Sequence, residues 1–192
     1  MSDQPAGTPD IRELRPPGFA DLLPSQSARD CLLAWRRARR DDLLPALGDF
    51  APQGLPAAVL PWLLIHRLRA DGELVFGVVG EELVRWFGKN PKGQPILGGI
   101  PEEERQARIA IVHQSLSSGM PFWFEGTLLL ENKEHLPIGR LCLPARHNAE
   151  RVLVLIYFVL QHQGKLPRLR AFLPGTYDAA RLVWCREEDL AP

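Results

Sequence analysis

The chain has 192 residues, of which 45% are hydrophobic and 24% are charged. These are ordinary values for a globular protein that buries a core, so they exclude a disordered or fibrous chain. Basic and acidic residues balance at 23 each, and no overall field favours nucleic acid or an anionic membrane surface.

Cysteine usage and the apolar runs indicate a cytoplasmic protein. Cys31, Cys142 and Cys185 are odd in number and show no disulfide framework or metal-ligand spacing. The N-terminal Met1–Pro9 lacks the pattern of a signal peptide. The longest apolar run, Val152–Leu160, falls short of the roughly 20 residues that cross a bilayer as a helix. We therefore expect contact with neither membrane nor nucleic acid.

Composition divides the chain into four segments. Residues 1–24 are rich in proline, glycine and charge, which predicts a flexible arm. Residues 25–60 hold a helix and a proline-punctuated connection, and residues 61–160 hold the main domain. Residues 161–192 form a C-terminal extension whose pattern assigns no structure.

An amphipathic helix is predicted over Ser27–Asp41. Ser27 and Asp30 have the spacing of a capping box, in which each side chain reaches a free backbone N–H. The helix has one apolar stripe and an arginine-rich opposite side. Leu33 lies among the arginines, which hints that this side also meets another surface. The apolar stripe is Ala28, Cys31, Leu32, Trp35 and Ala38.

Two strands and two helices follow. Trp62–Leu68 and Glu73–Val79 read as strands, and Asp71-Gly72 between them is a strong hairpin signal because both residues tolerate positive φ. A short helix over Glu81–Phe87 ends at Gly88. A longer helix opens at Pro101 and ends at Gly119, and its predicted apolar stripe is Ile109, Val112, His113 and Leu116.

Three more strands complete the domain, at Phe122–Leu130, Ile138–Leu143 and Val152–Leu160. The last is apolar at successive positions and partly β-branched, which is typical of a central strand covered on both faces. The order of elements indicates an α+β fold.

The most specific pattern is Glu73–Ile96. It reads Glu-Leu-Val-Phe-Gly-Val-Val-Gly-Glu-Glu-Leu-Val-Arg-Trp-Phe-Gly-Lys-Asn-Pro-Lys-Gly-Gln-Pro-Ile. A strand ends at Gly80, a short helix ends at Gly88, and a loop contains Gly93. This order resembles the strand-to-helix entry of PAS domains, in particular the stand-alone bacterial PAS-like proteins with the string V-G-x-x-(L/I)-V-x-x-F-G-x-(D/N)-x-x-G-x-P. The resemblance implies a five-stranded antiparallel sheet, its last strand in the middle and helices on one face, plus an N-terminal flanking helix.

The resemblance also implies a function. PAS-like proteins of this kind are sensory and regulatory, so we expect a non-catalytic protein that signals through a separate partner. A small ligand would bind between sheet and helices, at Phe76, Trp86, Ile109, Val112, His113, Leu128, Leu141 and Ile156. The flanking helix would contact a partner protein or a second copy through Leu32, Leu33, Trp35, Arg36 and Arg39.

Three alternatives stay open. The pocket could hold haem through His113, since an imidazole nitrogen binds haem iron, although we expect no cofactor. The cavity could be filled by the protein's own side chains, which leaves a scaffold. A small enzyme would need an acid/base pair from His113, Glu125 or His66. The sequence contains no nucleophile elbow, no phosphate-binding loop with its lysine, and no histidine or cysteine pair at metal-ligand spacing.

Overall fold

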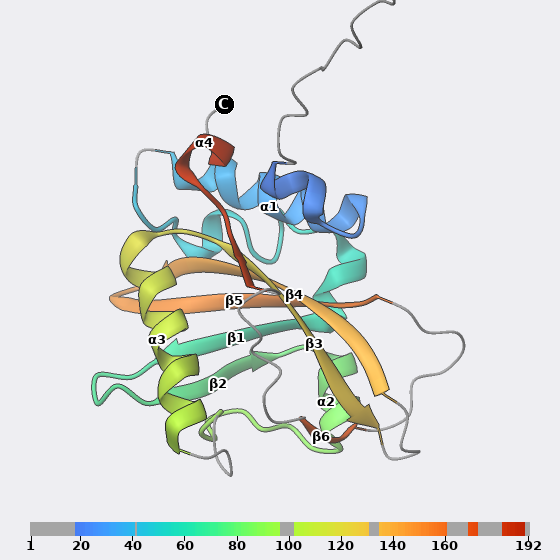
Figure 1. The fold of residues 1–192 in the computed structure, drawn as a ribbon. Helices are drawn as coiled ribbons and strands as arrows, with labels where there is room; N and C mark the ends of the chain where they lie inside the picture. Colours follow the sequence, from blue (N-terminus) through green and yellow to red (C-terminus); the bar gives the residue numbers. More distant parts are fainter. Residues whose placement is uncertain are drawn as a thin grey trace, which may run out of the picture.

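A twisted antiparallel sheet runs through the molecule, and helices pack against it (Figure 1). The computed structural model describes residues 18–40, 42–96, 102–130, 135–160, 169–172 and 182–190. The helices are α1 (Gln26–Arg39), α2 (Glu81–Phe87), α3 (Glu102–Ser118) and α4 (Glu187–Leu190), with 3-10 turns η1 (Phe19–Leu22), η2 (Leu47–Asp49) and η3 (Ala57–Trp62). The strands are β1 (Leu63–Leu68), β2 (Leu74–Val79), β3 (Phe122–Leu130), β4 (His135–His147), β5 (Glu150–Val159), β6 (Leu169–Phe172) and β7 (Leu182–Trp184).

The predicted α+β class is confirmed. Within the described residues the sheet has seven strands in the order β2-β1-β5-β4-β3-β6, and β7 also pairs with β3. All of these pairings are antiparallel, and β5 lies in the interior of the sheet, as the apolar run around it predicts. Residues 61–160 contribute the five predicted strands, β1 to β5, and the C-terminal extension, to which the sequence assigned no structure, adds β6 and β7 against the far side of β3.

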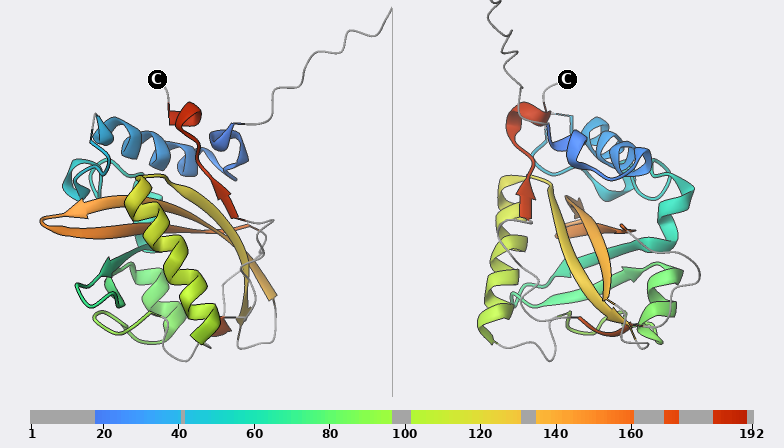
Figure 2. Two further views of the ribbon diagram at one scale, coloured as in Figure 1. Left: turned by 60° about the vertical axis from the view of Figure 1, so that its left-hand side comes forward. Right: turned by 45° about the vertical axis from the view of Figure 1, so that its right-hand side comes forward.

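The two helices of the main domain, α2 and α3, lie on one face of the sheet as expected, and the flanking helix α1 covers the opposite face. Side chains alternate between faces along a strand, and the buried residues of β4 and β5 accordingly divide into two clusters. Leu143 and Val154 pack with α1 on one face, whereas Cys142 and Leu155 pack with α2 and α3 on the other. Figure 2 shows α1 and α3 on opposite sides of the sheet.

Helix α1 starts one residue before the predicted Ser27, and its tryptophan holds it against the sheet. The N-cap is Ser25, whose Oγ accepts a hydrogen bond from Ala28 N at 3.2 Å, so the predicted capping role of Ser27 is wrong. Trp35 is fully buried, and its indole Nε1 donates to the Pro144 carbonyl of β4 at 2.7 Å. This bond ties α1 to a central strand.

The stretch around β2 has the predicted local structure. Gly72 adopts a φ of +84° in the β1–β2 turn, and Gly88 adopts +71° where it caps α2, conformations that favour glycine. The loop after α2 then covers the outer edge of β2. Phe76 N donates to Gln94 O at 3.0 Å, and Ile96 N donates to Leu74 O at 3.0 Å. Covering the edge in this way protects it from pairing with another chain.

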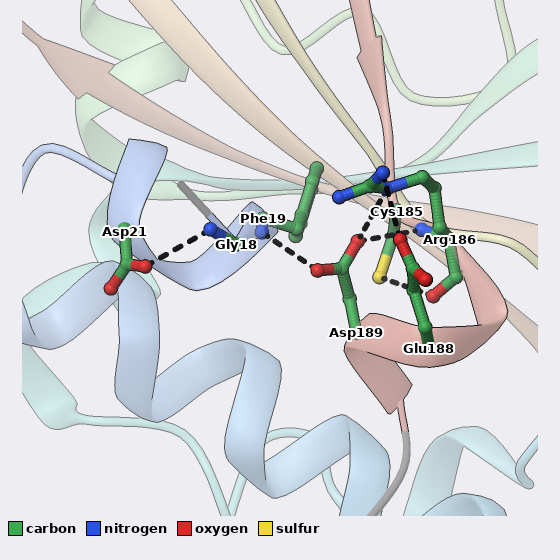
Figure 3. Close-up of polar contacts among 7 residues, drawn as sticks. All are labelled: Gly18, Phe19, Asp21, Cys185, Arg186, Glu188 and Asp189. Atoms are coloured by element: carbon green, nitrogen blue, oxygen red, sulfur yellow. Dashed lines mark hydrogen bonds and ion pairs between the residues drawn. The ribbon is translucent and has the colours of Figure 1, made fainter. Parts of the chain in front are cut away.

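The carboxylate of Asp189 joins the N-terminal and C-terminal segments (Figure 3). Its Oδ1 accepts a hydrogen bond from Phe19 N at 3.1 Å, and its Oδ2 accepts one from Arg186 N at 3.0 Å. Burial alone would raise the pKa of Asp189, but the hydrogen bonds from Arg186 and Phe19 outweigh it and lower the pKa. Phe19 and Leu23 are buried in the core, so the end of the predicted flexible arm is packed; residues 1–17 lie outside the described part.

Gly139 of β4 gives a direct test of this packing. The indole of Trp123 lies across Gly139, in contact with the position that a Cβ would occupy, whereas a Cβ at Gly48 would meet nothing within 4 Å. We expect Gly139→Ala to lower the free energy of unfolding by about 1–3 kcal/mol through overpacking. Gly48→Ala should stay within about 0.5 kcal/mol of wild type. Urea denaturation measures both, and equal stabilities for the two variants would contradict the packing.

Candidate functional site

A partly enclosed cavity of about 70 Å³ lies between α3 and the sheet. Strands β1 to β5, helix α3 and the loop after α2 all contribute to its wall. Most of the wall is apolar or aromatic, which is typical of small-molecule sites in proteins. The described lining residues are Leu64, His66, Leu74, Phe76, Ile96, Arg108, Ile111, Val112, Phe122, Phe124, Arg140, Cys142, Leu153, Leu155 and Tyr157.

Arg140 brings a positive charge into this apolar wall. It lies on β4, is only 9% exposed, and faces the cavity because it alternates with Ile138 and Cys142 on the same face. Its guanidinium carbon lies 4.1 Å from the ring centroid of Phe124 and 5.7 Å from that of Tyr157. Such cation–π contacts offset part of the cost of removing the charge from water.

Arg108 brings a second guanidinium from the opposite wall. It lies on α3 one turn before Val112 and two turns before Leu116, on the face of the helix that packs against the sheet. The residue is only 8% exposed and lines the cavity. Two arginines from two different elements therefore approach one small cavity, while the described lining contains no aspartate or glutamate.

His66 of β1 is the third polar residue of the wall. It is 8% exposed, and its Nε2 is buried without a hydrogen-bond partner among the described residues. Burial, with a smaller contribution from the charge of Arg140, lowers the pKa of His66 from 6.5 to about 3. The imidazole is therefore neutral at physiological pH. Neutral imidazole can donate through one nitrogen and accept through the other.

The cysteines are unsuited to nucleophilic chemistry. Cys31, Cys142 and Cys185 are buried free thiols. Burial raises the pKa of each to about 12, so the thiols stay protonated and the reactive thiolate is scarce. Cys142 belongs to the cavity wall, and there it acts as a small apolar side chain.

Several predicted ligand-binding residues do gather on the cavity side of the sheet. Phe76 and Val112 line the cavity. Trp86 and Ile109 pack in the same apolar cluster but outside the cavity wall, and Trp86 stacks edge-on against Trp62 at 5.0 Å between ring centroids. The side chain of Leu128 lies outside the described residues.

Three predicted ligand-binding residues point elsewhere. Leu141 and Ile156 are buried on the opposite face of the sheet, in the cluster under α1. Side chains alternate along each strand, so their neighbours Cys142 and Leu155 face the cavity instead. His113 is exposed, so its placement on the apolar stripe of the long helix is wrong. One residue beyond Val112, it is rotated about 100° around the helix, away from the sheet.

The sequence prediction missed Arg108 and Arg140, although each carried a signal. Arg140 interrupts an otherwise apolar set at every second position, Ile138, Arg140 and Cys142, which marks a charge on a buried face. Arg108 precedes Val112 by four residues and so shares its helical face. Neither signal was decisive alone, since both depend on which face of the element is buried.

The predicted partner surface on α1 divides in the structure. Leu32 and Trp35 are buried in the core, so their assignment to an interface is wrong. Leu33 is 40% exposed. Together with Leu190 at the C-terminal end, Arg36 and Arg39 border an open groove on the outer side of the helix that also includes Leu33, Arg37, Arg40 and Asp42.

The residues considered for acid/base chemistry do not come together. His66 lines the cavity, His113 is exposed on α3, and Glu125 accepts a hydrogen bond from Trp123 Nε1 at 3.0 Å on the other face of the sheet. Among the described residues, no group of three or more histidine, cysteine, aspartate or glutamate side chains could hold a metal ion. No described helix is long and apolar enough to span a bilayer.

No family model matches the chain, and no curated protein matches it. A functional assignment therefore depends on the residues and geometry of this chain.

The buried imidazole predicts a pH dependence. The unfolded chain binds a proton at His66 below about pH 6.5, but the folded chain does so only near pH 3, so acid stabilises the unfolded state across this window. In wild type, this contribution should cost about 2 kcal/mol of unfolding free energy between pH 7 and pH 5. His66→Leu should not show it. Burial raises the pKa of Cys142, another wall residue, to about 12, so its thiol stays neutral across this range.

The measurement is urea denaturation of both proteins at pH 7, 6 and 5. Phe76→Leu alters the same wall without removing a titrating group, so it should follow the pH dependence of wild type. Parallel pH dependence in wild type and His66→Leu would show that the imidazole is not held neutral by burial.

Proposed function

We propose that this chain is a PAS-like regulatory protein that binds a small ligand between α3 and the sheet. The order β2-β1-β5-β4-β3, in which β5, the last of the five strands along the chain, lies in the interior, supports the PAS-like architecture. The flanking helix α1 before β1 agrees with it. Fold alone does not define a function, so the functional proposal depends on the cavity.

The observation that carries the proposal is a cavity whose wall holds buried polar groups. Apolar side chains would fill such a space at lower cost, because buried charges and an unpartnered imidazole nitrogen destabilise a fold that does not use them. Buried charged residues and a strongly shifted pKa in one concave site are typical of functional sites.

A route from the cavity to the outer surface follows from the alternation of β5. Leu155 belongs to the cavity wall, while its neighbours Val154 and Ile156 pack in the cluster under α1. The bond from Trp35 Nε1 to Pro144 O links α1 to β4 as well. A ligand that shifts these central strands would therefore change the position of α1 on the sheet. The contact is spatial, and a change in binding at α1 when the cavity is occupied would measure the energetic coupling between the two sites.

The exposed side of α1 is the proposed output surface. Leu33 gives it an exposed apolar side chain, and the arginines of the groove surround that side chain with charge. A partner protein or a second copy of the chain would bind there and respond to a shift of α1.

A scaffold without ligand is the competing function, and the cavity size favours it. Pockets for drug-sized ligands measure about 300–1,000 Å³, whereas this cavity measures about 70 Å³. Such a space admits a few water molecules or a ligand of a few heavy atoms. The two functions differ in whether small molecules from the cell stabilise the protein.

Thermal shift in a small-molecule extract of the protein's natural cells separates the two functions. A ligand at 100 times its Kd adds about 2.7 kcal/mol to the stability of the folded state, which is about 5–10 °C in Tm for a chain of this size. We expect this rise for wild type in extract relative to buffer. Val112→Phe, which fills the cavity from α3, should abolish it.

Gln114→Ala is the matched control, since Gln114 is exposed on the same helix. It should respond to the extract as wild type does. No rise in wild type would favour the scaffold over the ligand-binding regulator. An equal rise in Val112→Phe would show that the ligand binds outside the cavity and would contradict the proposed site.

A further inference from the structure

We infer that the cavity binds a small organic carboxylate, held by Arg140, Arg108 and His66, with its short apolar part against the leucine and valine wall. The inference rests on the proposed function, because it names the chemical class of the ligand for the same cavity. Its warrant is the combination of charge, hydrogen-bonding capacity and volume in one place.

Charge indicates an anion. The guanidinium groups of Arg140 and Arg108, from two different elements, both line a cavity of about 70 Å³. Each guanidinium carries five N–H donors in a planar fork, so it can serve a ligand in addition to its protein contacts. In an apolar, water-poor site, the attraction between such a fork and an anion is far stronger than in water.

The buried imidazole supplies a further donor. His66 Nε2 is buried, lines the same cavity, and has no hydrogen-bond partner among the described residues. In the tautomer with its hydrogen on Nε2, the neutral ring can donate to a carboxylate oxygen. A ligand oxygen at this point would remove the cost of the unsatisfied nitrogen, which is about 1–3 kcal/mol for a buried polar group.

The rest of the wall distinguishes a carboxylate from inorganic phosphate. A carboxylate places both oxygens at one end of the molecule, where an arginine fork and an imidazole can serve them. Its carbon chain can then contact Leu64, Val112 and Leu155, which are apolar. Phosphate has oxygens on all sides, and those directed at these side chains would lose their hydrogen bonds to water.

Volume limits the length of the acid. The cavity exceeds by a few fold the roughly 10–15 Å³ that one water needs on the same measure. Acids of about two to four carbons match this space, whereas flavin, haem and nucleotides need the several hundred Å³ of a typical cofactor site.

The test compares acids with uncharged analogues of the same shape. Isothermal titration calorimetry at pH 7 would use acetate, propanoate, butanoate and hexanoate, the matching primary amides, and inorganic phosphate. We expect at least one acid to bind wild type, with its amide weaker by about 10-fold or more, as for loss of a charged hydrogen bond. The comparison uses unmodified protein, so it does not depend on any variant folding.

Variants then locate the site. Arg140→Met and Arg108→Met should each weaken acid binding by about 10- to 100-fold. Arg151→Met is the matched control, because Arg151 is exposed at the start of β5 and does not line the cavity; it should bind as wild type does. Equal weakening in Arg151→Met, or unchanged binding in both cavity variants, would overturn the site.

Other outcomes overturn the ligand class. Amides that bind as tightly as acids would exclude recognition of the charge, and phosphate binding without acid binding would exclude an organic carboxylate. If no acid binds while the cell extract still raises Tm, the ligand class is wrong and the regulatory site stands. If neither acids nor extract has an effect, the proposed function is wrong as well.

Discussion

The side-chain alternation of β4 and β5 is the constraint on which the other features depend. These two strands pair along almost their whole length, from Ile138 opposite Val159 to His147 opposite Glu150. Both faces are covered, so the buried apolar residues of their central part divide between two clusters. A shift of register by one residue would exchange the two clusters and is therefore strongly disfavoured. The same pairing decides that Arg140 faces α3 and that Leu141 faces α1.

A buried charge in such a strand needs a compensating environment. Arg140 lies against the rings of Phe124 and Tyr157, which recover part of the lost hydration. Leucine or isoleucine at this position would pack at lower cost, since replacing buried ionic groups by apolar ones often leaves stability unchanged or raises it. The presence of Arg140 and Arg108 beside the neutral His66, whose Nε2 has no hydrogen-bond partner among the described residues, therefore favours ligand binding over stabilisation of the fold as their role. The small volume of the cavity then restricts what can be recognised.

Local signals in the sequence were sufficient for most elements and insufficient for their orientation. Helix α2 and strand β3 have the predicted bounds, because glycine, periodicity and turn chemistry are local properties. The strand around Val152–Leu160 lies in the interior of the sheet, as its continuous apolar pattern indicates.

Orientation depends on contacts between distant parts of the chain. Leu141 and Ile156 were assigned to the wrong face because two covered faces leave no polar alternation to read. The stripe of α3 was rotated by one residue, which exchanged buried Arg108 for exposed His113. Leu32 and Trp35 were assigned to a partner interface because the sequence does not show that the apolar stripe of α1 packs on the protein's own sheet. Strands β6 and β7 are short and take their structure from pairing with β3, so their own residues predict little.

Isotope-filtered NMR would test most directly whether the cavity between α3 and the sheet is the ligand site. The sample would be wild-type protein with saturating butanoate. The cavity geometry predicts nuclear Overhauser effects from butanoate protons to the methyl groups of Val112 and Leu155, with a shifted Nε–H resonance of Arg140. Overhauser effects confined to the groove around Leu33 on α1, with the cavity methyl groups unaffected, would contradict it.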